Sequence, residues 1–418
     1  MEIKRDQYLN QLISRKHDGL IKIITGIRRC GKSYLLRTIF KNHLLENGVP
    51  ENHIVEMAFD LFENIDYQNP RVFYAWAMDR IKDNGQYYFL LDEVQLLGEF
   101  VSVLNGLADK KNVDVYVTGS NAKFLAKDVA TEFGGRGEEI RMYPLSFSEF
   151  MSVYSGQSYK GWDQYLTYGG IPLVVLADDV QKKDALLTSL FQETYIRDIV
   201  QRNKVKNPIE LENLLDILSS SIGSLTNPNK LENTFKSVNH SQITASTINK
   251  YLGYLEDSFL ISQAKRYDIR GKAYIGTPQK YYYTDLGLRN ARLNYRQIKV
   301  SHSMDNAIYN ELLIRGFKVD VGNIILVEKG EADKLCKKHL EVDFVCNKGS
   351  KRYYIQSAFA LENEDKIKQE IRPLLKTKDY CKKIVITSNT PSPFYTEEGI
   401  LVMNVFDFML NKDSLDTF

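Results

Sequence analysis

The chain has 418 residues and a mass of 48.2 kDa, which is enough for about two to four domains. Apolar residues make up 43% and charged residues 26%, and 55 basic against 53 acidic residues give a net charge of +2. This balance excludes a globally basic nucleic-acid-coating protein, but it does not exclude a local basic face.

Targeting and cysteine patterns predict a cytoplasmic protein. No apolar run approaches the roughly 18 residues of a membrane span, and the N-terminal segment has no apolar signal-peptide core. Cys30, Cys336, Cys346 and Cys381 show no paired spacing, so neither a disulfide scaffold nor a four-cysteine zinc site is expected.

The first element with a chemical signature is a β-branched run from Leu20 to Thr25, which predicts a buried parallel strand. It leads into a match to the phosphate-loop pattern G-x-x-x-x-G-K-[ST] at every fixed position, and an amphipathic helix follows. In such a loop, backbone N–H groups face the phosphates, the lysine reaches the β- and γ-phosphates, and the serine hydroxyl ligates Mg²⁺. We therefore expect Lys32 and Ser33 to act in these two roles. The residues expected to bind ATP are Gly26, Ile27, Arg28, Arg29, Cys30, Gly31, Lys32, Ser33 and Tyr34.

The second informative strand runs from Gln86 to Val94 and ends in two adjacent acids. Such a pair beside a buried strand is costly unless a cation offsets its charge. Because a phosphate loop precedes it, we expect Asp92 to hold Mg²⁺ and Glu93 to polarise the attacking water. The alternative is a strand that ends at a solvated acidic turn.

A third strand, Val113 to Asn121, ends in small polar groups, and another strand begins after Arg136. Since parallel strands end at a common crevice, Ser120 or Asn121 could sense the γ-phosphate, although a helix N-cap explains them equally well. Arg136 could complete a neighbouring subunit's site, or its own, by stabilising transition-state charge. A plain surface arginine is the alternative.

These segments together resemble a family of bacterial and archaeal AAA-type P-loop ATPases related to the STAND-like signal-transduction NTPases. The resemblance is carried by GIRRCGKS, FLLDEVQ, VTGSN, GGRGEEIRMYPLSFSEF and YGGIPLVV. It implies an AAA+ core of the additional-strand type over residues 1–150, hydrolysis assisted by Glu93, a sensor at Ser120, an arginine finger at Arg136 and a C-terminal domain of unknown function. Gly170-Ile171-Pro172 resembles the lid signature of such NTPases.

The middle of the chain predicts a helical lid over 151–205 and a winged-helix domain over 206–295. In the second segment, helices precede two strands, Phe259 to Asp268 and Lys280 to Asp285, which is the order of a winged helix. A local basic stretch interleaved with tyrosines could face duplex DNA, whereas a face for protein contacts is the alternative. Its basic residues are Lys265, Arg266, Arg270, Lys272 and Lys280.

Residues 296–418 read as α/β and resemble the PD-(D/E)XK restriction-endonuclease fold. Glu311 lies in a predicted helix, Glu341 and Asp343 in one strand, and Gln356 in the next. Metal-assisted cleavage needs acids for Mg²⁺ and a lysine to activate water. Because the expected acid-x-lysine is Gln356-Ser357-Ala358, we predict an endonuclease-like domain that is catalytically inactive.

The sequence therefore predicts an α/β protein that binds ATP and Mg²⁺ and hydrolyses ATP to ADP and phosphate. We expect hydrolysis to act as a conformational switch for an unidentified protein partner, with a homo-oligomer as one arrangement. The alternative is an ATP-dependent DNA-processing protein that grips duplex DNA with the winged helix and the C-terminal domain.

Overall fold

The computed structural model describes residues 3–119, 133–239, 241–329, 335–361 and 363–417. The chain divides into two compact units, Met1–Pro144 with Asp257–Phe259, and Leu145–Glu256 with Leu260–Phe418. The core unit thus ends at Pro144, close to the predicted boundary at 150, and the three segments predicted after it share the second unit. Among the described helices, none is both long and apolar enough to cross a membrane.

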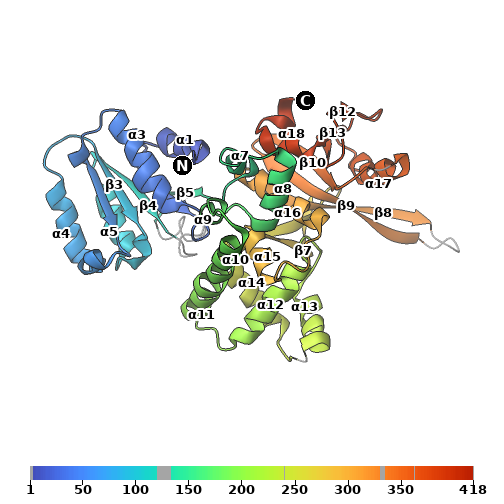
Figure 1. The fold of residues 1–418 in the computed structure, drawn as a ribbon, viewed down its shortest axis with the longest axis horizontal. Coiled ribbons are helices and arrows are strands. Elements are labelled where there is room, and N and C mark those ends of the chain that lie inside the picture. The colour runs from blue at the N-terminus through green and yellow to red at the C-terminus, as the bar shows by residue number, and fades with distance from the viewer. Residues whose placement is uncertain (1–2, 120–132, 240, 330–334, 362, 418) are drawn as a thin grey trace. The chain divides into compact units, whose positions relative to one another are not determined.

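A five-stranded parallel sheet forms the centre of the first unit (Figure 1). Its strand order is β2-β3-β4-β1-β5. The strands are β1 (Ile21–Thr25), β2 (Ile54–Ala58), β3 (Tyr87–Asp92), β4 (Val113–Thr118) and β5 (Gly137–Arg141). Because β4 lies between β1 and β3, the sheet has the additional-strand order that the resemblance implies.

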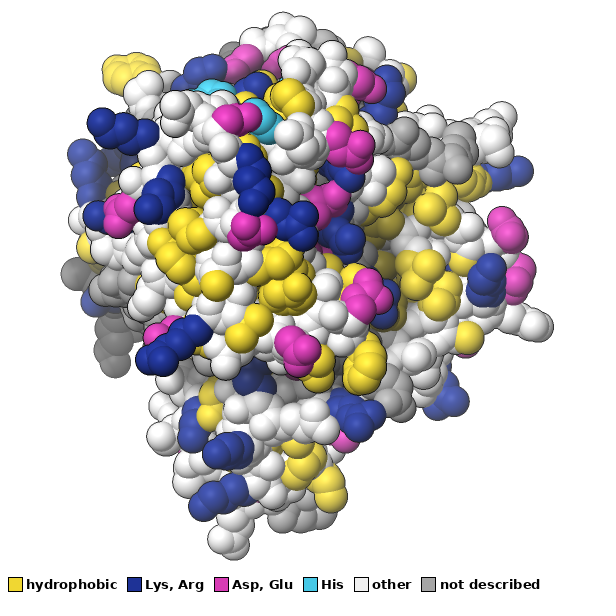
Figure 2. All heavy atoms as spheres, turned by 90° about the vertical axis from the view of Figure 1, so that its left-hand side faces the viewer, with side chains coloured by type: hydrophobic (Ala, Val, Ile, Leu, Met, Phe, Trp, Pro, Cys, Tyr) yellow, Lys and Arg dark blue, Asp and Glu magenta, His cyan; other side chains and the backbone are white. Residues whose placement is uncertain are grey.

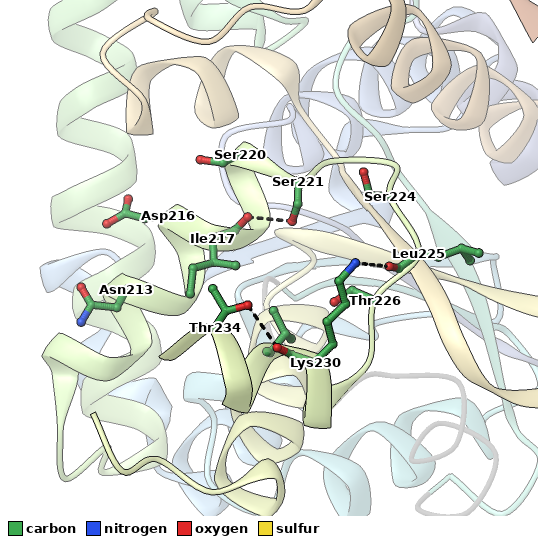
Figure 3. Close-up of a pocket in the computed structure, with 11 residues that line it drawn as sticks. Asn213, Asp216, Ile217, Ser220, Ser221, Ser224, Leu225, Thr226, Lys230 and Thr234 are labelled. Carbon is green, nitrogen blue, oxygen red and sulfur yellow. Dashed lines mark hydrogen bonds between the residues drawn. The ribbon is translucent and has the colours of Figure 1, made fainter. Parts of the chain in front are cut away.

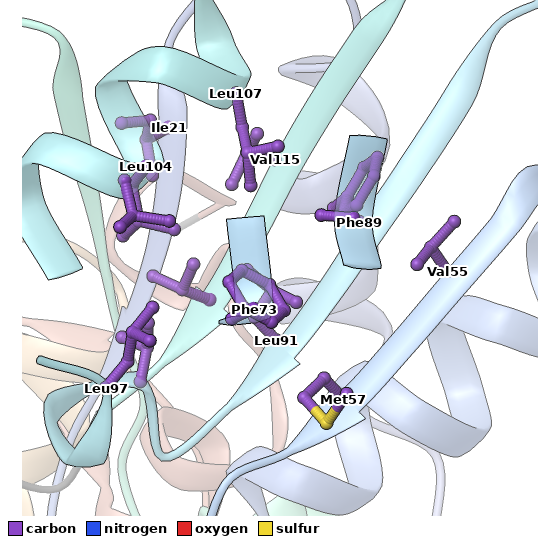
Figure 4. Close-up of a cluster of buried hydrophobic side chains, with 14 of the residues drawn as sticks. Ile21, Val55, Met57, Phe73, Phe89, Leu91, Leu97, Leu104, Leu107 and Val115 are labelled. Atoms are coloured by element: carbon purple, nitrogen blue, oxygen red, sulfur yellow. The ribbon is translucent and has the colours of Figure 1, made fainter. Parts of the chain in front are cut away.

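Helices cover both faces of this sheet, which explains why β1, β3 and β4 are buried along their whole length. On one face, α4 (Pro70–Arg80) and α5 (Phe100–Ala108) contribute Phe73 and Leu104 to the main apolar core (Figure 4). On the other face, Phe40 packs against Tyr116 with ring centroids 4.5 Å apart. Phe40 belongs to a continuous helix formed by α2 (Lys32–Tyr34), η1 (Leu35–Phe40) and α3 (Lys41–Glu46). The remaining elements of the unit are α1 (Asp6–Ser14), η2 (Glu51–His53), η3 (Phe62–Gln68) and η4 (Val94–Leu96).

The second unit begins with the helices predicted for the lid and the winged helix. In α14, Ile248, Tyr251, Leu252 and Leu255 are buried on one face, as their spacing predicts. The first group is α7 (Phe147–Met151), α8 (Ser158–Tyr168), α9 (Pro172–Val175), α10 (Val180–Ser189), η6 (Leu190–Ile196) and α11 (Arg197–Asn203). The second group is α12 (Pro208–Ser220), α13 (Pro228–Thr234), η7 (Phe235–Asn239), α14 (Ala245–Asp257) and α15 (Leu286–Arg292).

An eight-stranded mixed sheet with the order β12-β13-β11-β10-β9-β8-β6-β7 completes the second unit. Its strands are β6 (Ile261–Asp268), β7 (Ala273–Tyr283), β8 (Lys318–Lys329), β9 (Leu335–Lys348), β10 (Lys351–Ala358), β11 (Lys382–Thr387), β12 (Phe394–Tyr395) and β13 (Leu401–Asn404). The helices after residue 295 are α16 (Val300–Ile314), α17 (Glu364–Leu375), α18 (Val405–Leu410) and α19 (Ser414–Thr417).

Two features of this sheet differ from the prediction. Strand β7 starts at Ala273, so most of the loop predicted over residues 269–279 is extended strand. Strand β6 pairs in parallel with β8, with Arg266 opposite Val321. The sheet therefore crosses the boundary predicted at 295/296, because the hairpin β6–β7 finds its neighbour in the segment that follows.

Candidate nucleotide-binding site

The loop after β1 adopts backbone conformations that require glycine at two positions. At Gly26 the φ angle is +140°, and a Cβ there would lie 2.1 Å from the backbone oxygen of Met142. Gly31, with a φ of +103°, stands directly before the helix that begins at Lys32. Both positions disfavour any side chain, which is the physical reason for the glycines of the pattern.

The side chain of Lys32 is buried inside this loop. Its Nζ donates hydrogen bonds to the backbone oxygens of Gly26, at 2.9 Å, and Ile27, at 3.1 Å. The ammonium is thus held at the first turn of a helix that continues to Glu46. The loop and the helix N-terminus direct positive charge to one place, as a phosphate requires.

The acidic strand end lies against the phosphate loop. The Ser33 hydroxyl donates a 2.9 Å hydrogen bond to Oδ1 of Asp92. The Thr118 hydroxyl donates to the same oxygen and accepts a 3.0 Å hydrogen bond from the backbone N–H of Glu93. Burial raises the pKa of Asp92, and the hydrogen bonds from Thr118 and Ser33 oppose that rise. The predicted metal ligands Ser33 and Asp92 are therefore adjacent.

Glu93 follows at the exit from β3. Its φ of +52° places it in the left-handed region, and Gln95 donates a side-chain hydrogen bond to its carboxylate. A non-glycine residue in this region costs roughly 1–2 kcal/mol, so the surrounding contacts hold the turn in place. The turn presents the second acid at the same sheet edge as the phosphate loop.

Thr118 is a site residue that the sequence reasoning missed. It is the last residue of β4, is fully buried, and lies beside Asp92 because β4 is the neighbour of β3. The available signal was a hydroxyl at the end of an apolar strand, two positions before Ser120 and three before Asn121, the predicted sensor residues. Those residues, Ser120 and Asn121, lie outside the described part of the chain.

Arg136 lies at the end of the strands opposite to the phosphate loop. Its backbone oxygen accepts a 2.8 Å hydrogen bond from Ile21, the first residue of β1, whereas the phosphate loop follows the last residue of β1. Five strand residues at about 3.3 Å each span roughly 16 Å, which is beyond the reach of an arginine side chain. Its guanidinium forms a 2.6 Å ion pair with Asp109. In this structure Arg136 therefore lies away from the phosphate loop of its own chain, and its role stays a prediction.

The N-terminal segment formed by Arg5 and α1 also contacts the phosphate loop and the residues after β5, which nothing in the sequence signalled. Arg5 is buried and donates to the backbone oxygens of Cys30, at 3.2 Å, and Tyr143, at 2.7 Å. The Tyr8 hydroxyl accepts a 3.1 Å hydrogen bond from the backbone of Tyr143. This segment therefore ties the loop to the residues after β5.

Three of the five basic residues on the predicted basic face of the hairpin bind other residues of the second unit. Arg266 donates to Asn323 at 2.5 Å, Arg270 donates to the backbone oxygen of Lys376, and Lys280 forms a 2.7 Å ion pair with Glu341. Of the five basic residues, only Lys265 and Lys272 are exposed, because the hairpin lies within the large sheet. Figure 2 views the molecule from the side of the first unit, where basic and acidic side chains are interspersed.

The predicted nuclease-like acids are not brought together as expected. Glu311 is buried in α16 and forms a 2.7 Å ion pair with Arg315, one turn further along the same helix. The acid of α16 that interacts electrostatically with Asp343 and Glu341 is Asp305. The two acids of α16 are six residues apart, so they project from different faces of the helix.

A cavity of about 410 Å³ lies between α12 and α13 (Figure 3). Ser221 donates to the backbone oxygen of Ile217 at 2.7 Å, and Thr234 donates to that of Lys230 at 3.1 Å. The Nζ of Lys230 donates to the backbone oxygen of Leu225 at 3.1 Å. These three side chains donate their hydrogen bonds to backbone oxygens, so they do not form a group of catalytic residues in the cavity.

Comparison with known families matches two segments of the chain. Residues 18–151 match the AAA domain, and residues 159–299 match a domain of unknown function, DUF8612. An uncharacterized protein of Haemophilus influenzae is 35% identical over 417 residues, covering 98% of each chain. The chain belongs to the same family as this protein. The match to the AAA domain supports the AAA-type P-loop assignment, and the domain of unknown function covers most of the segments that the sequence predicted as a lid and a winged helix.

A second relative is less similar in sequence. An uncharacterized protein of Methanocaldococcus jannaschii is 28% identical over 364 residues, covering 84% of this chain and 77% of its own. Among solved structures, a Walker-type ATPase of Pyrococcus abyssi is similar over 70% of this chain and 96% of its own, with 14% identity and a TM-score of 0.49.

Proposed function

We propose that the first unit binds ATP with Mg²⁺ and hydrolyses it, and that hydrolysis switches how the chain binds a protein partner. The observation that carries this proposal is the hydrogen bond between Ser33 and Asp92, which joins the phosphate loop to the acidic strand end. It brings an ammonium, a hydroxyl and two carboxylates to one edge of an additional-strand sheet.

The donor set fits a nucleotide and its metal ion. The hydroxyl of Ser33 and the carboxylate of Asp92 are oxygen ligands of the kind that Mg²⁺ prefers. Residues 26–34 would hold the phosphates through the loop backbone and the helix N-terminus. When bound, Mg²⁺ neutralises charge that develops on the phosphate oxygens.

Each side chain then has a defined task. Lys32 exchanges the backbone oxygens of Gly26 and Ile27 for phosphate oxygens, and Glu93 orients the attacking water and accepts its proton. Thr118 holds Asp92 and the backbone of Glu93 in register. Arg136 would act in the site of another copy, so a catalytic role for it requires an oligomer. Ser120 remains the proposed sensor.

The test is steady-state ATP hydrolysis by the full chain and by Glu93→Gln. We expect nucleotide affinity to remain within about threefold, because the amide keeps the shape of the side chain, and the hydrolysis rate to fall by ~10²-fold or more. Glu99→Gln, the same change at an exposed glutamate six residues further on, is the control and should hydrolyse ATP like the unmodified chain. An unchanged rate in Glu93→Gln would show that Glu93 is not the base.

Two further arms test the switch and its alternative. Glu93→Gln loaded with ATP should retain a protein partner that the ADP-bound chain releases. Duplex DNA should leave the hydrolysis rate unchanged, because three of the five basic residues of the hairpin have internal partners. A several-fold increase that disappears with added salt would instead favour a DNA-processing protein. We further propose that residues 296–418 keep an endonuclease-like fold without cleaving DNA.

A further inference from the structure

An acidic centre in the second unit contains a buried lysine. The Nζ of Lys280, on β7, lies 2.7 Å from Oε1 of Glu341 and 3.4 Å from Oδ1 of Asp343, and the lysine is only 5% exposed. The other oxygen of Asp343 accepts a 3.0 Å hydrogen bond from the backbone of Ser357. Two carboxylates of one strand therefore converge on a single internal ammonium.

Two further groups belong to this centre. Burial, followed by the nearby Asp343 carboxylate, raises the pKa of Asp305 on α16, and the charge of Lys280 opposes that rise. The Tyr282 hydroxyl is fully buried, lies within electrostatic range of Lys280, Asp305 and Asp343, and has no hydrogen-bond partner among the described residues. The centre thus holds three acids against one cation.

We propose that the ammonium of Lys280 takes the place of a divalent cation in this centre and closes it to metal ions. Carboxylates of Asp305, Glu341 and Asp343 would suit Mg²⁺ or Mn²⁺ as oxygen ligands at about 2.1 Å from the ion. That position is filled by Nζ. Among the described residues, no group of three His, Cys, Asp or Glu side chains is arranged to hold a metal ion, and this includes the centre while Lys280 occupies it.

The charge of the lysine is well supported. Burial alone would lower the pKa of Lys280, but Tyr282, Asp343 and Glu341 outweigh it and hold that pKa well above its usual value. The amide of Gln356 is also turned inward: its Oε1 accepts from the backbone of Asp343 at 3.4 Å, and its Nε2 donates to Glu370 at 3.5 Å. The strand β10 therefore offers neither an acid nor a lysine to a metal ion at this centre.

Binding of Mn²⁺ to the full chain without nucleotide tests the proposal, which does not depend on ATP hydrolysis. Asp343→Asn keeps the shape of the side chain, and we expect it to bind as many Mn²⁺ ions as the unmodified chain, because the centre holds none. The loss of one ion in Asp343→Asn would overturn the proposal.

Removing the lysine should open the centre. We expect Lys280→Met to bind one more Mn²⁺ per chain than the unmodified protein, and Lys280→Met combined with Asp343→Asn to lose that ion again. Any ion held at Ser33 and Asp92 is common to all variants and cancels in the comparison. If Lys280→Met folds, as judged by circular dichroism, and binds no additional Mn²⁺, the proposal is wrong. If it does not fold, the comparison of Asp343→Asn with the unmodified chain still decides.

Discussion

Each of the two units places a largely buried acid next to a strand end or bulge, yet the two acids have opposite kinds of partner. Asp92 accepts hydrogen bonds from the hydroxyls of Ser33 and Thr118, whereas Asp343 lies beside the ammonium of Lys280. A hydroxyl adds no charge and can itself become a metal ligand, while an ammonium neutralises the acid and occupies the position of a cation. The partner, and not the acid, therefore decides whether a carboxylate is available for metal chemistry.

The largest effect should come from removing the internal cation. Lys280→Met leaves Glu341, Asp343 and Asp305 close together without compensation, and breaking a buried ion pair in this way costs about 3–5 kcal/mol. Urea unfolding at neutral pH would measure this loss. Lys265→Met, at an exposed position of β6, is the control and should change the free energy of unfolding by less than ~0.5 kcal/mol. If Lys280→Met and Lys265→Met lowered the free energy of unfolding equally, the burial of Lys280 among acids would not explain the loss, and the contrast between the two units would fail.

The next effect concerns metal affinity at the first site. Asp92→Asn should weaken the binding of Mg²⁺ in the presence of ADP by roughly 10- to 100-fold, because one of its two protein ligands loses its charge. Since burial raises the pKa of Asp92, the neutral amide is not expected to destabilise the unit. Calorimetric titration of Mg²⁺ measures the change, and Asp343→Asn should leave this affinity unaltered.

A third buried acid has backbone N–H groups as its partners. Asp285 accepts hydrogen bonds from the backbone of Gly170, at 2.7 Å, and Leu288, at 3.1 Å, and burial raises its pKa to about 6 against these N–H groups. The folded state therefore binds this proton more tightly than the unfolded state, and the contribution of Asp285 to stability falls as the pH rises from about 4 through 6.

The corresponding measurement is the free energy of unfolding at several pH values. The advantage of the unmodified chain over Asp285→Asn should fall by about 2 kcal/mol between pH 4.5 and 7. Asp179→Asn is the matched control, because Asp179 also caps a helix but is exposed. A constant difference between the unmodified chain and Asp285→Asn would show that Asp285 does not titrate in this range.

The smallest effect should follow the loss of one hydroxyl at the first site. Thr118→Val removes the hydrogen bond to Asp92 and the acceptor for the backbone of Glu93, so we expect ATP hydrolysis to slow by roughly fivefold, as for a net loss of about 1 kcal/mol. Thr118→Ser keeps the hydroxyl and should retain most of the activity. Hydrolysis rates of both variants at saturating ATP provide the check.

Much of the first unit could be predicted because its signals are local. The phosphate loop, the acids Asp92 and Glu93 and the strands that carry them are each readable within a few neighbouring residues. The lengths of β1, β3 and β4 follow from continuous apolar runs in a sheet covered on both faces. The carboxyl ends of neighbouring parallel strands meet, so the meeting of Ser33 with Asp92 was also expected.

The sequence by itself thus determined which residues are candidates for phosphate and metal chemistry, whereas the tertiary structure alone decided which partners they meet. The sequence predicted that Lys280 belongs to a basic face. In the folded protein, strand pairing buries it beside Glu341, 61 positions later in the chain. Thr118 became a site residue through the order of the sheet, and the helical turn exposed Asp305 rather than Glu311 to the acidic centre. Such partners are distant in the chain. Strand order, register and burial determine how close they lie in the folded protein, and no local sequence pattern contains that information.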